Sequence, residues 1–147
     1  MLFRSVEREV LEEKFLVTRE SREMVKIPAG RFQMGSPESE LGRDSNEKLH
    51  SVTLTKGFYM ARHEVTEEWW DDVMGSGSSS SKLSQGNVSW DNAVAFCNQL
   101  SLSEGLTQAY TINGPNGDVT WNREANGYRL PTEADRKSTR LNSTHRL

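Results

Sequence analysis

Cys97 is the one residue of this 147-residue sequence whose side chain could act as a thiol nucleophile. A reactive cysteine needs an electropositive, partly exposed setting that favours the thiolate. Cys97 instead falls on the apolar stripe of a helix expected after Ser89, where a free cysteine behaves as a small buried hydrophobe. A single cysteine also excludes an internal disulfide and a cysteine-rich zinc site. We therefore expect Cys97 to be structural rather than catalytic.

Two histidines and one oxygen-rich cluster are the candidate metal ligands. His50 and His63 are too far apart in sequence for a helix-spaced pair, so we expect partly exposed histidines at strand ends. Asn113, Asn116 and Asp118 could contact calcium, but no glutamate follows at EF-hand spacing, and turn formation explains all three. Phosphate-binding glycine loops, nucleophile elbows and carboxylate dyads are missing too. The sequence therefore assigns no catalytic, cofactor-binding or metal-binding residue.

Composition limits the class of protein. With 34% hydrophobic and 27% charged residues, the sequence is typical of a soluble globular domain, and no apolar run approaches the ~20 residues that span a bilayer. Residues 1–9 alternate charged and apolar side chains and lack the core of a secretory signal, so a cytoplasmic location is the default expectation. We expect no membrane partner.

Charge disfavours a nucleic-acid partner. The net charge is −3, and residues 135–147 carry a surplus of three positive charges, which leaves −6 on residues 1–134. An acidic body of this kind repels a phosphate backbone.

The first half of the chain is expected to be mainly β structure. Residues 1–23 fit a short amphipathic helix with Leu2, Val6, Val10 and Leu11 on one face, or a linker, about equally well. Residues 24–34 alternate in polarity around Gly30, which predicts a β-hairpin. Residues 36–48 read as an exposed loop, and 52–55 and 58–61 as short strands.

Two helices and a second hairpin should follow. Thr66 and Ser89 are suitable N-caps, and Gly75 and Gly105 are suitable stops. The expected buried faces comprise Trp69, Trp70, Val73 and Met74 in the first helix and Trp90, Ala93, Val94, Cys97 and Leu100 in the second. The Gly/Ser-rich stretch 75–81 should be a surface loop, and 110–112 and 119–121 should pair as a hairpin.

Several ordered segments resemble the formylglycine-generating-enzyme (sulfatase-modifying factor) family. The longer ones are 24–36, which contains Pro-Ala-Gly-Arg-Phe-Gln-Met-Gly, 88–101, which begins Val-Ser-Trp-Asp-Asn-Ala, and 125–134, which ends Gly-Tyr-Arg-Leu-Pro-Thr-Glu-Ala. Shorter ones lie at 50–54, 58–60, 64–66 and 105–106. The resemblance spans 24–134 and implies an α+β fold: a partial C-type-lectin-like domain with short strands, two main helices and much irregular structure.

The resemblance also implies what an intact member could do. Some members oxidise a sulfatase cysteine to formylglycine with copper and a cysteine pair, and they hold structural calcium. Those cysteines and calcium ligands lie in a C-terminal half that has no counterpart here. We therefore expect the fragment to be inactive and its parent to act on a sulfatase-type protein substrate. The alternative is a non-catalytic lectin-like binding or structural module. A sulfoxide synthase ranks third, because no histidine cluster precedes the domain.

The end of the chain departs from the family pattern, which continues Glu-Trp-Glu-Tyr-Ala-Ala after Ala134. Thr132 and Asp135 can still form a capping-box-like helix start. Residues 136–147 contain only Leu141 and Leu147 as apolar residues, so we expect no buried face there, and the stretch from Asp135 resembles a translated sequencing adapter.

The domain organisation follows from these observations. We expect an N-terminal extension or linker at 1–23, the N-terminal half of a family domain at 24–134, and a non-native tail at 135–147. Half a core should leave large apolar side chains without partners, so the chain should be partly folded and prone to aggregate. The side chains in question are Trp69, Trp70, Trp90 and Trp121.

Overall fold

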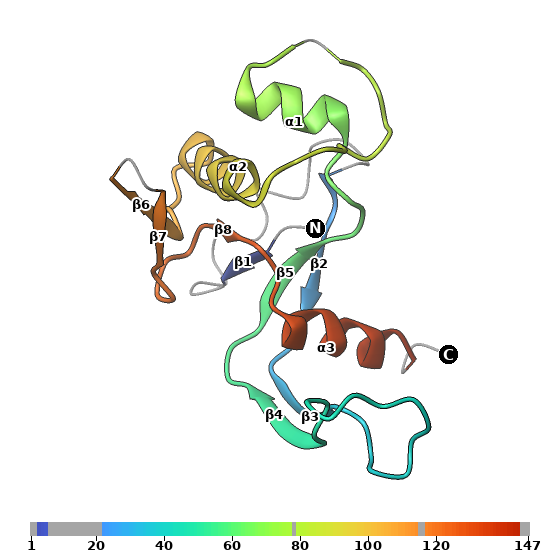
Figure 1. Ribbon diagram of the computed structural model, residues 1–147. Coiled ribbons are helices and arrows are strands. Elements are labelled where there is room, and N and C mark those ends of the chain that lie inside the picture. Colours follow the sequence, from blue (N-terminus) through green and yellow to red (C-terminus); the bar gives the residue numbers. More distant parts are fainter. Residues whose placement is uncertain (1–2, 6–21, 78, 115–116, 145–147) are drawn as a thin grey trace.

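A computed structural model describes residues 3–5, 22–77, 79–114 and 117–144. Its elements, in chain order, are β1 (Phe3–Ser5), β2 (Met24–Ile27), β3 (Gly30–Met34), β4 (His50–Leu54), β5 (Phe58–Ala61), α1 (Glu67–Met74), α2 (Trp90–Ser103), β6 (Tyr110–Asn113), β7 (Asp118–Trp121), β8 (Tyr128–Arg129) and α3 (Glu133–Thr144). Figure 1 shows α1 and α2 at one end of the molecule, β3 and β4 at the other, and α3 beside the ribbon that joins them.

Residues 24–34 and 50–61 form one bent antiparallel ribbon. β2 pairs with β5 and β3 pairs with β4, in registers that place residues 55–57 opposite 28–29. Three residues facing two make a bulge, which bends a ribbon and increases its twist. Gly57 lies in this bulge, where a Cβ atom would come within 3.0 Å of the Ile27 carbonyl oxygen. The glycine therefore permits a close approach of the two backbones.

The hairpin predicted within residues 24–34 is wrong. β2 and β3 exist, but each pairs with a strand from 50–61 rather than with the other. Gly30 is the first residue of β3 and is not among the glycines with positive φ, so it does not form the tight turn that such a hairpin needs. The strands predicted at 52–55 and 58–61 are confirmed as β4 and β5.

A four-stranded sheet joins the start of the chain to its last strand. Its order is β2-β5-β1-β8, with β1 antiparallel to both neighbours. Residues 3–5 therefore contribute a strand, although the sequence indicated a helix or linker over 1–23. The expected helical face of Leu2, Val6, Val10 and Leu11 lies outside the described residues.

The start and end signals of α1 are confirmed. The Thr66 hydroxyl accepts a hydrogen bond from the Trp69 N–H at 3.2 Å, and Gly75 adopts left-handed geometry with φ of 66°. Trp69 is 2% exposed. Residues 75–77, at the start of the predicted Gly/Ser-rich loop, are exposed.

The long helix α2 is confirmed, but its buried face differs from the predicted stripe. Ser89 caps the helix by accepting from the Asn92 N–H at 3.2 Å. Val94, Cys97 and Leu100 are buried as expected, whereas Trp90 is 56% exposed. Trp90 is the first residue of the helix, so its side chain lies at the rim of the core rather than inside it.

The larger core cluster gathers around α2, and a smaller one lies on the ribbon at Ile27, Phe58 and Met60. The buried members of the larger cluster are Ala61, Trp69, Val94, Phe96, Cys97, Leu100, Leu106, Ala109, Tyr110, Ala125 and Tyr128.

Asn98 of α2 fixes the hairpin formed by β6 and β7. Its amide donates to the Tyr110 carbonyl at 2.8 Å and accepts from the Tyr110 N–H at 3.2 Å. The predicted hairpin is confirmed by the pairing of Tyr110 with Trp121 and of Asn113 with Asp118.

The third helix, α3, begins with the expected capping box. The Asp135 N–H donates to the Thr132 hydroxyl at 3.2 Å, and the Asp135 carboxylate accepts from the Thr132 N–H at 2.8 Å. Ser138, one turn later, is 5% exposed. The start of α3 therefore packs against the ribbon through Ser138, although we expected residues 136–147 to bury no face. No helix in the described part of the chain is both long and apolar enough to cross a bilayer.

Candidate functional site

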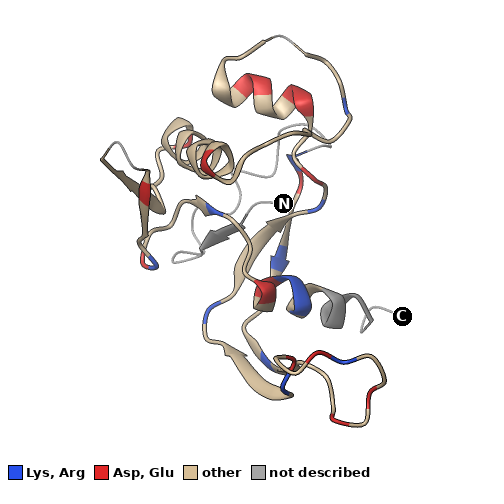
Figure 2. Ribbon diagram, in the orientation of Figure 1, with Lys and Arg blue, Asp and Glu red and all other residues tan. Residues whose placement is uncertain are grey.

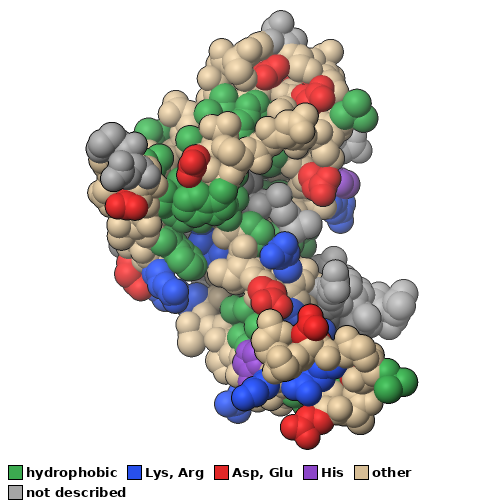
Figure 3. Space-filling view, viewed as in Figure 1, with side chains coloured by type: hydrophobic (Ala, Val, Ile, Leu, Met, Phe, Trp, Pro, Cys, Tyr) green, Lys and Arg blue, Asp and Glu red, His purple; other side chains and the backbone are tan. Residues whose placement is uncertain are grey.

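A hollow of about 260 Å³ lies where α1, α2 and the segment after β8 meet. Most of its lining is apolar, and the polar part comes from position 64 and from the segment 84–85. The apolar lining residues are Val65, Trp70, Val88, Ala93, Phe96 and Leu130, and the polar ones are Glu64, Ser84 and Gln85. Figure 3 shows hydrophobic side chains gathered over α2 and between α1 and α2. A concave apolar site with a few polar groups is the usual form of a binding site.

Stacked aromatic rings line part of the hollow. The Trp70 and Phe96 rings are nearly parallel, at an interplanar angle of 5°, and their centroids lie 4.9 Å apart. Trp69 meets the Phe96 ring edge-on at 6.2 Å. Because the cap at Thr66 fixes where α1 begins, it also fixes which tryptophan is buried and which reaches the hollow. The site thus combines a rigid aromatic surface with an open side.

Backbone hydrogen bonds hold the polar rim in place. The Gln85 N–H donates to the Val65 carbonyl at 2.8 Å, and the Glu67 N–H donates to the Leu83 carbonyl at 2.9 Å. Across the same pair of segments the Ser84 hydroxyl donates to the Glu64 carboxylate at 2.7 Å. The position of the Glu64 carboxylate is therefore set by a neighbouring segment.

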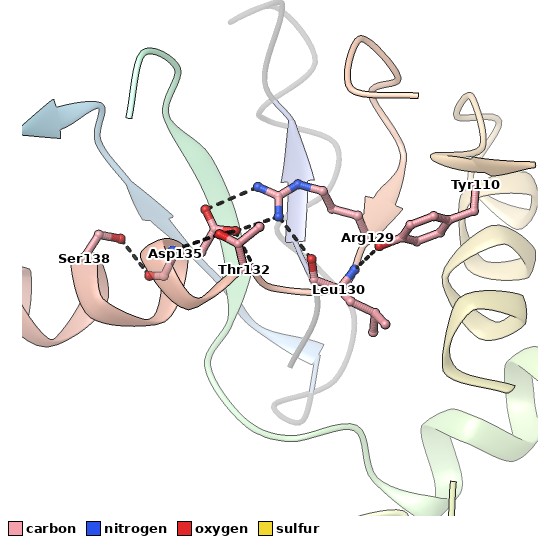
Figure 4. A network of polar contacts seen from close by, with 6 residues as sticks. All are labelled: Tyr110, Arg129, Leu130, Thr132, Asp135 and Ser138. Atoms are coloured by element: carbon pink, nitrogen blue, oxygen red, sulfur yellow. Dashed lines mark hydrogen bonds and ion pairs between the residues drawn. The ribbon is translucent and has the colours of Figure 1, made fainter. Parts of the chain in front are cut away.

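A second polar cluster lies at the start of α3 (Figure 4). The Arg129 guanidinium donates to the Asp135 carboxylate at 2.7 Å and to the Leu130 carbonyl at 3.1 Å, while the Leu130 N–H donates to the Tyr110 hydroxyl at 2.9 Å. Burial alone would raise the pKa of Asp135, but hydrogen bonds from Arg129 and Thr132 outweigh it and lower that pKa. Because its members bond one another, this cluster is structural.

A smaller pocket of about 80 Å³ adjoins the second cluster. Ser138 lines it, together with ribbon residues Pro28, Ala29, Gly30, Arg31, Phe32 and Leu54. The Ser138 hydroxyl donates to the Asp135 carbonyl at 2.7 Å, within its own helix. A small polar side chain therefore occupies a buried position beside unfilled space.

Of the candidate residues named from sequence, none that the structure describes lines the hollow. Cys97 is fully buried, and desolvation raises its pKa to about 12, so its thiol is protonated near neutral pH. His50 and His63 are exposed, and His50 Nδ1 lies 2.7 Å from the Lys48 carbonyl oxygen. Among the described residues no group of three or more histidine, cysteine or acidic side chains could hold a metal ion.

The implied metals do not fit the residues that the structure describes. A copper site built on a cysteine pair needs two accessible thiols, whereas Cys97 is the sole cysteine of the sequence and is buried. In the oxygen-rich turn the Asn113 amide donates to the Thr120 hydroxyl at 3.0 Å, and Asn116 lies outside the described residues.

Sequence reasoning missed the hollow and the role of Arg129. Glu64 lies in a segment that resembles the family, but Ser84 and Gln85 come from a segment without a recognisable motif, and only folding brings the three to Trp70 and Leu130. The capping-box signal at Thr132 and Asp135 and the family-like segment 127–134 were the sequence features that lay in the Arg129 cluster.

Comparisons with known proteins place these features in a family context. The family described as "Sulfatase-modifying factor enzyme 1-like domain" matches residues 11–140. A protein of Paenibacillus barcinonensis described as "Chaperone protein LppX" is 33% identical over an alignment of 134 residues, and the match covers 80% of this chain and 45% of that protein.

Two solved structures share the fold. The "Treponema denticola variable protein 1" aligns with a TM-score of 0.65 and 28% identity, over 79% of this chain and 51% of that one. CarF aligns with a TM-score of 0.59 and 23% identity, over 78% and 54% of the respective chains. The chain thus spans about half the length of the relatives that it matches.

Proposed function

Since the chain belongs to the family of sulfatase-modifying factor enzyme 1-like domains and has their partial C-type-lectin-like fold, we propose that it is a non-catalytic polypeptide-binding module. In this proposal the hollow between α1 and α2 receives an apolar side chain of another protein.

The single observation that carries the proposal is the hollow itself. The partly buried Trp70 ring, stacked on the buried Phe96 ring, offers an apolar surface beside a space of about 260 Å³. The rim supplies a carboxylate, a hydroxyl and an amide, groups that orient a peptide backbone. The relative described as a chaperone also supports a polypeptide-binding function, because chaperones bind other polypeptides.

A second candidate is favoured by the family description: the parent protein oxidises a sulfatase cysteine to formylglycine. Cys97 cannot supply that chemistry, because burial keeps its thiol protonated and out of reach. An oxidase would need a reactive cysteine pair that binds copper, and that pair would have to come from polypeptide beyond this chain.

We further propose that the chain is the N-terminal half of a longer protein and that residues 135–147 are a non-native tail. Its length, about half that of the relatives, and the adapter-like residues after Ala134 support this proposal. Reading the gene past the Ala134 codon in an independent clone tests it. Two downstream cysteines would favour the oxidase, and natural coding sequence identical to residues 135–147 would contradict the tail.

Peptide binding to the purified chain tests the binding module. The probe is a short neutral peptide with a central Leu-Phe pair and a fluorescent label, and binding is followed by fluorescence anisotropy. Ala93→Leu, which places a larger side chain in the hollow, should abolish binding. Gln99→Leu adds a similar side chain to an exposed position of α2 and should leave binding unchanged. Absence of binding, or equal binding by both variants, would contradict the proposal.

A further inference from the structure

Carboxylates outnumber cations on the elements around the hollow. Among the described residues they comprise Glu64 on the rim, Glu67, Glu68, Asp71 and Asp72 on α1, and Asp91 on α2, and no lysine or arginine lies within α1 (Figure 2). Two cations from other segments answer them: Lys82 pairs with Glu68 at 2.6 Å, and Arg22 pairs with Asp72. Six carboxylates against two cations leave a local surplus of negative charge.

Glu64 brings this negative charge to the mouth of the hollow. It lines the cavity and is exposed, and its carboxylate accepts the hydrogen bond from Ser84. An ionised carboxylate has about four lone-pair sites, so one such bond leaves capacity for an incoming ammonium or guanidinium group. The Ser84 bond also holds the carboxylate in a fixed position, which favours a directed contact.

We infer that the partner is a polypeptide segment in which lysine or arginine flanks a bulky apolar residue. This inference rests on the proposed function and names the class of partner. The apolar residue occupies the hollow against Trp70, which the buried Phe96 ring supports from behind, and the flanking cation lies at Glu64. Charge complementarity of this kind sets specificity and association rate more than total affinity.

The acidic surround also disfavours other partners. A segment with glutamate or aspartate beside its apolar residue would place like charges at Glu64, which costs affinity. Because the rim is solvent-exposed, each charge contact should change affinity by a factor of about five or less.

Three labelled peptides test the inference, all of equal length with the same central Leu-Phe pair. Their flanking residues are lysine and arginine in the first, serine and glycine in the second, and glutamate and aspartate in the third. We expect the basic peptide to bind about fivefold more tightly than the neutral one and the acidic peptide more weakly still. Raising the ionic strength from about 0.1 M to about 1 M shortens the Debye length from about 10 Å to about 3 Å and should remove most of the difference.

A conservative pair of variants locates the effect. Glu64→Gln keeps the shape of the rim and should weaken the basic peptide severalfold while leaving the neutral peptide unchanged. Glu38→Gln, in the exposed loop after β3, removes the same charge elsewhere and should change neither. Equal binding of the three peptides, with Ala93→Leu blocking each, would overturn the inference and leave the proposed function standing. Failure of all three peptides to bind would overturn both.

Discussion

The Arg129 guanidinium and the Asp135 carboxylate form a two-pronged ion pair, with Nη1 to Oδ2 at 2.7 Å and Nη2 to Oδ1 at 3.3 Å. The side chains are only 14% and 2% exposed. The same guanidinium lies over the rings of Phe58 at 5.9 Å and Trp121 at 5.3 Å. One side chain therefore links β8, α3, the long ribbon and the second hairpin.

Removing the carboxylate should destabilise the chain strongly. Asp135→Asn leaves the Arg129 charge in a poorly hydrated site, and breaking such a buried pair costs about 3 kcal/mol. Urea denaturation followed by tryptophan fluorescence measures the loss. Asp118→Asn, in the exposed hairpin, is the matched control and should change stability little. A loss no larger than that of the control would contradict the role assigned to the pair.

The pair should also make stability depend on acid pH. Since the folded pKa of Asp135 lies below the ordinary value of 3.8, the carboxylate stabilises the fold above that value. This contribution is lost as the pH falls through the folded pKa. Urea midpoints measured between about pH 2 and about pH 6 should therefore fall more steeply for the wild-type chain than for Asp135→Asn. If the urea midpoints of the two chains fell equally steeply with pH, another titrating group would dominate the acid dependence of stability.

Filling the pocket beside Ser138 should stabilise the chain. The family pattern after Ala134 has tyrosine at position 138, and Ser138 is buried against an unfilled pocket of about 80 Å³. Ser138→Tyr should add about 1 kcal/mol and raise the melting temperature by a few degrees, as cavity-filling substitutions do. Ser80→Tyr adds the same side chain in an exposed loop and should leave the melting temperature unchanged. A lower melting temperature for Ser138→Tyr would count against the proposal that residues 135–147 are non-native.

The helices and the second hairpin could be predicted from sequence because their signals are local. Thr66, Ser89 and the Thr132–Asp135 pair each cap a helix through hydrogen bonds within three residues of the cap. The ribbon could not be predicted in the same way. Gly30 looked like a turn, but β2 and β3 find their partners in residues 50–61, a long-range pairing that no local pattern specifies.

The surroundings of the tryptophan side chains also depend on long-range contacts that the local sequence does not specify. Trp69 packs edge-on against Phe96, Trp70 stacks on it, and Trp121 lies under Arg129, so these three have partners. Trp90, by contrast, is 56% exposed. The expectation of a truncated core did not indicate which apolar side chains would still find partners.

The buried thiol should be inert in the folded chain. Desolvation raises the pKa of Cys97 to about 12, so the thiolate is rare near neutral pH and the sulfur is out of reach. Ellman's reagent should label no thiol in the native chain and one after guanidinium denaturation. Rapid stoichiometric labelling of the native chain would return Cys97 to the list of reactive residues and weaken the case for a non-catalytic module.

Nuclear magnetic resonance titration tests most directly whether the hollow binds polypeptide. On addition of the basic Leu-Phe peptide, the indole N–H resonance of Trp70 and the methyl resonances of Val65 and Val88 should shift in a saturable manner. The indole of Trp121 and the methyls of Ile27, which lie outside the hollow, should stay in place. Unchanged Trp70, Val65 and Val88 resonances at saturating peptide, or shifts confined to other surfaces, would contradict the account.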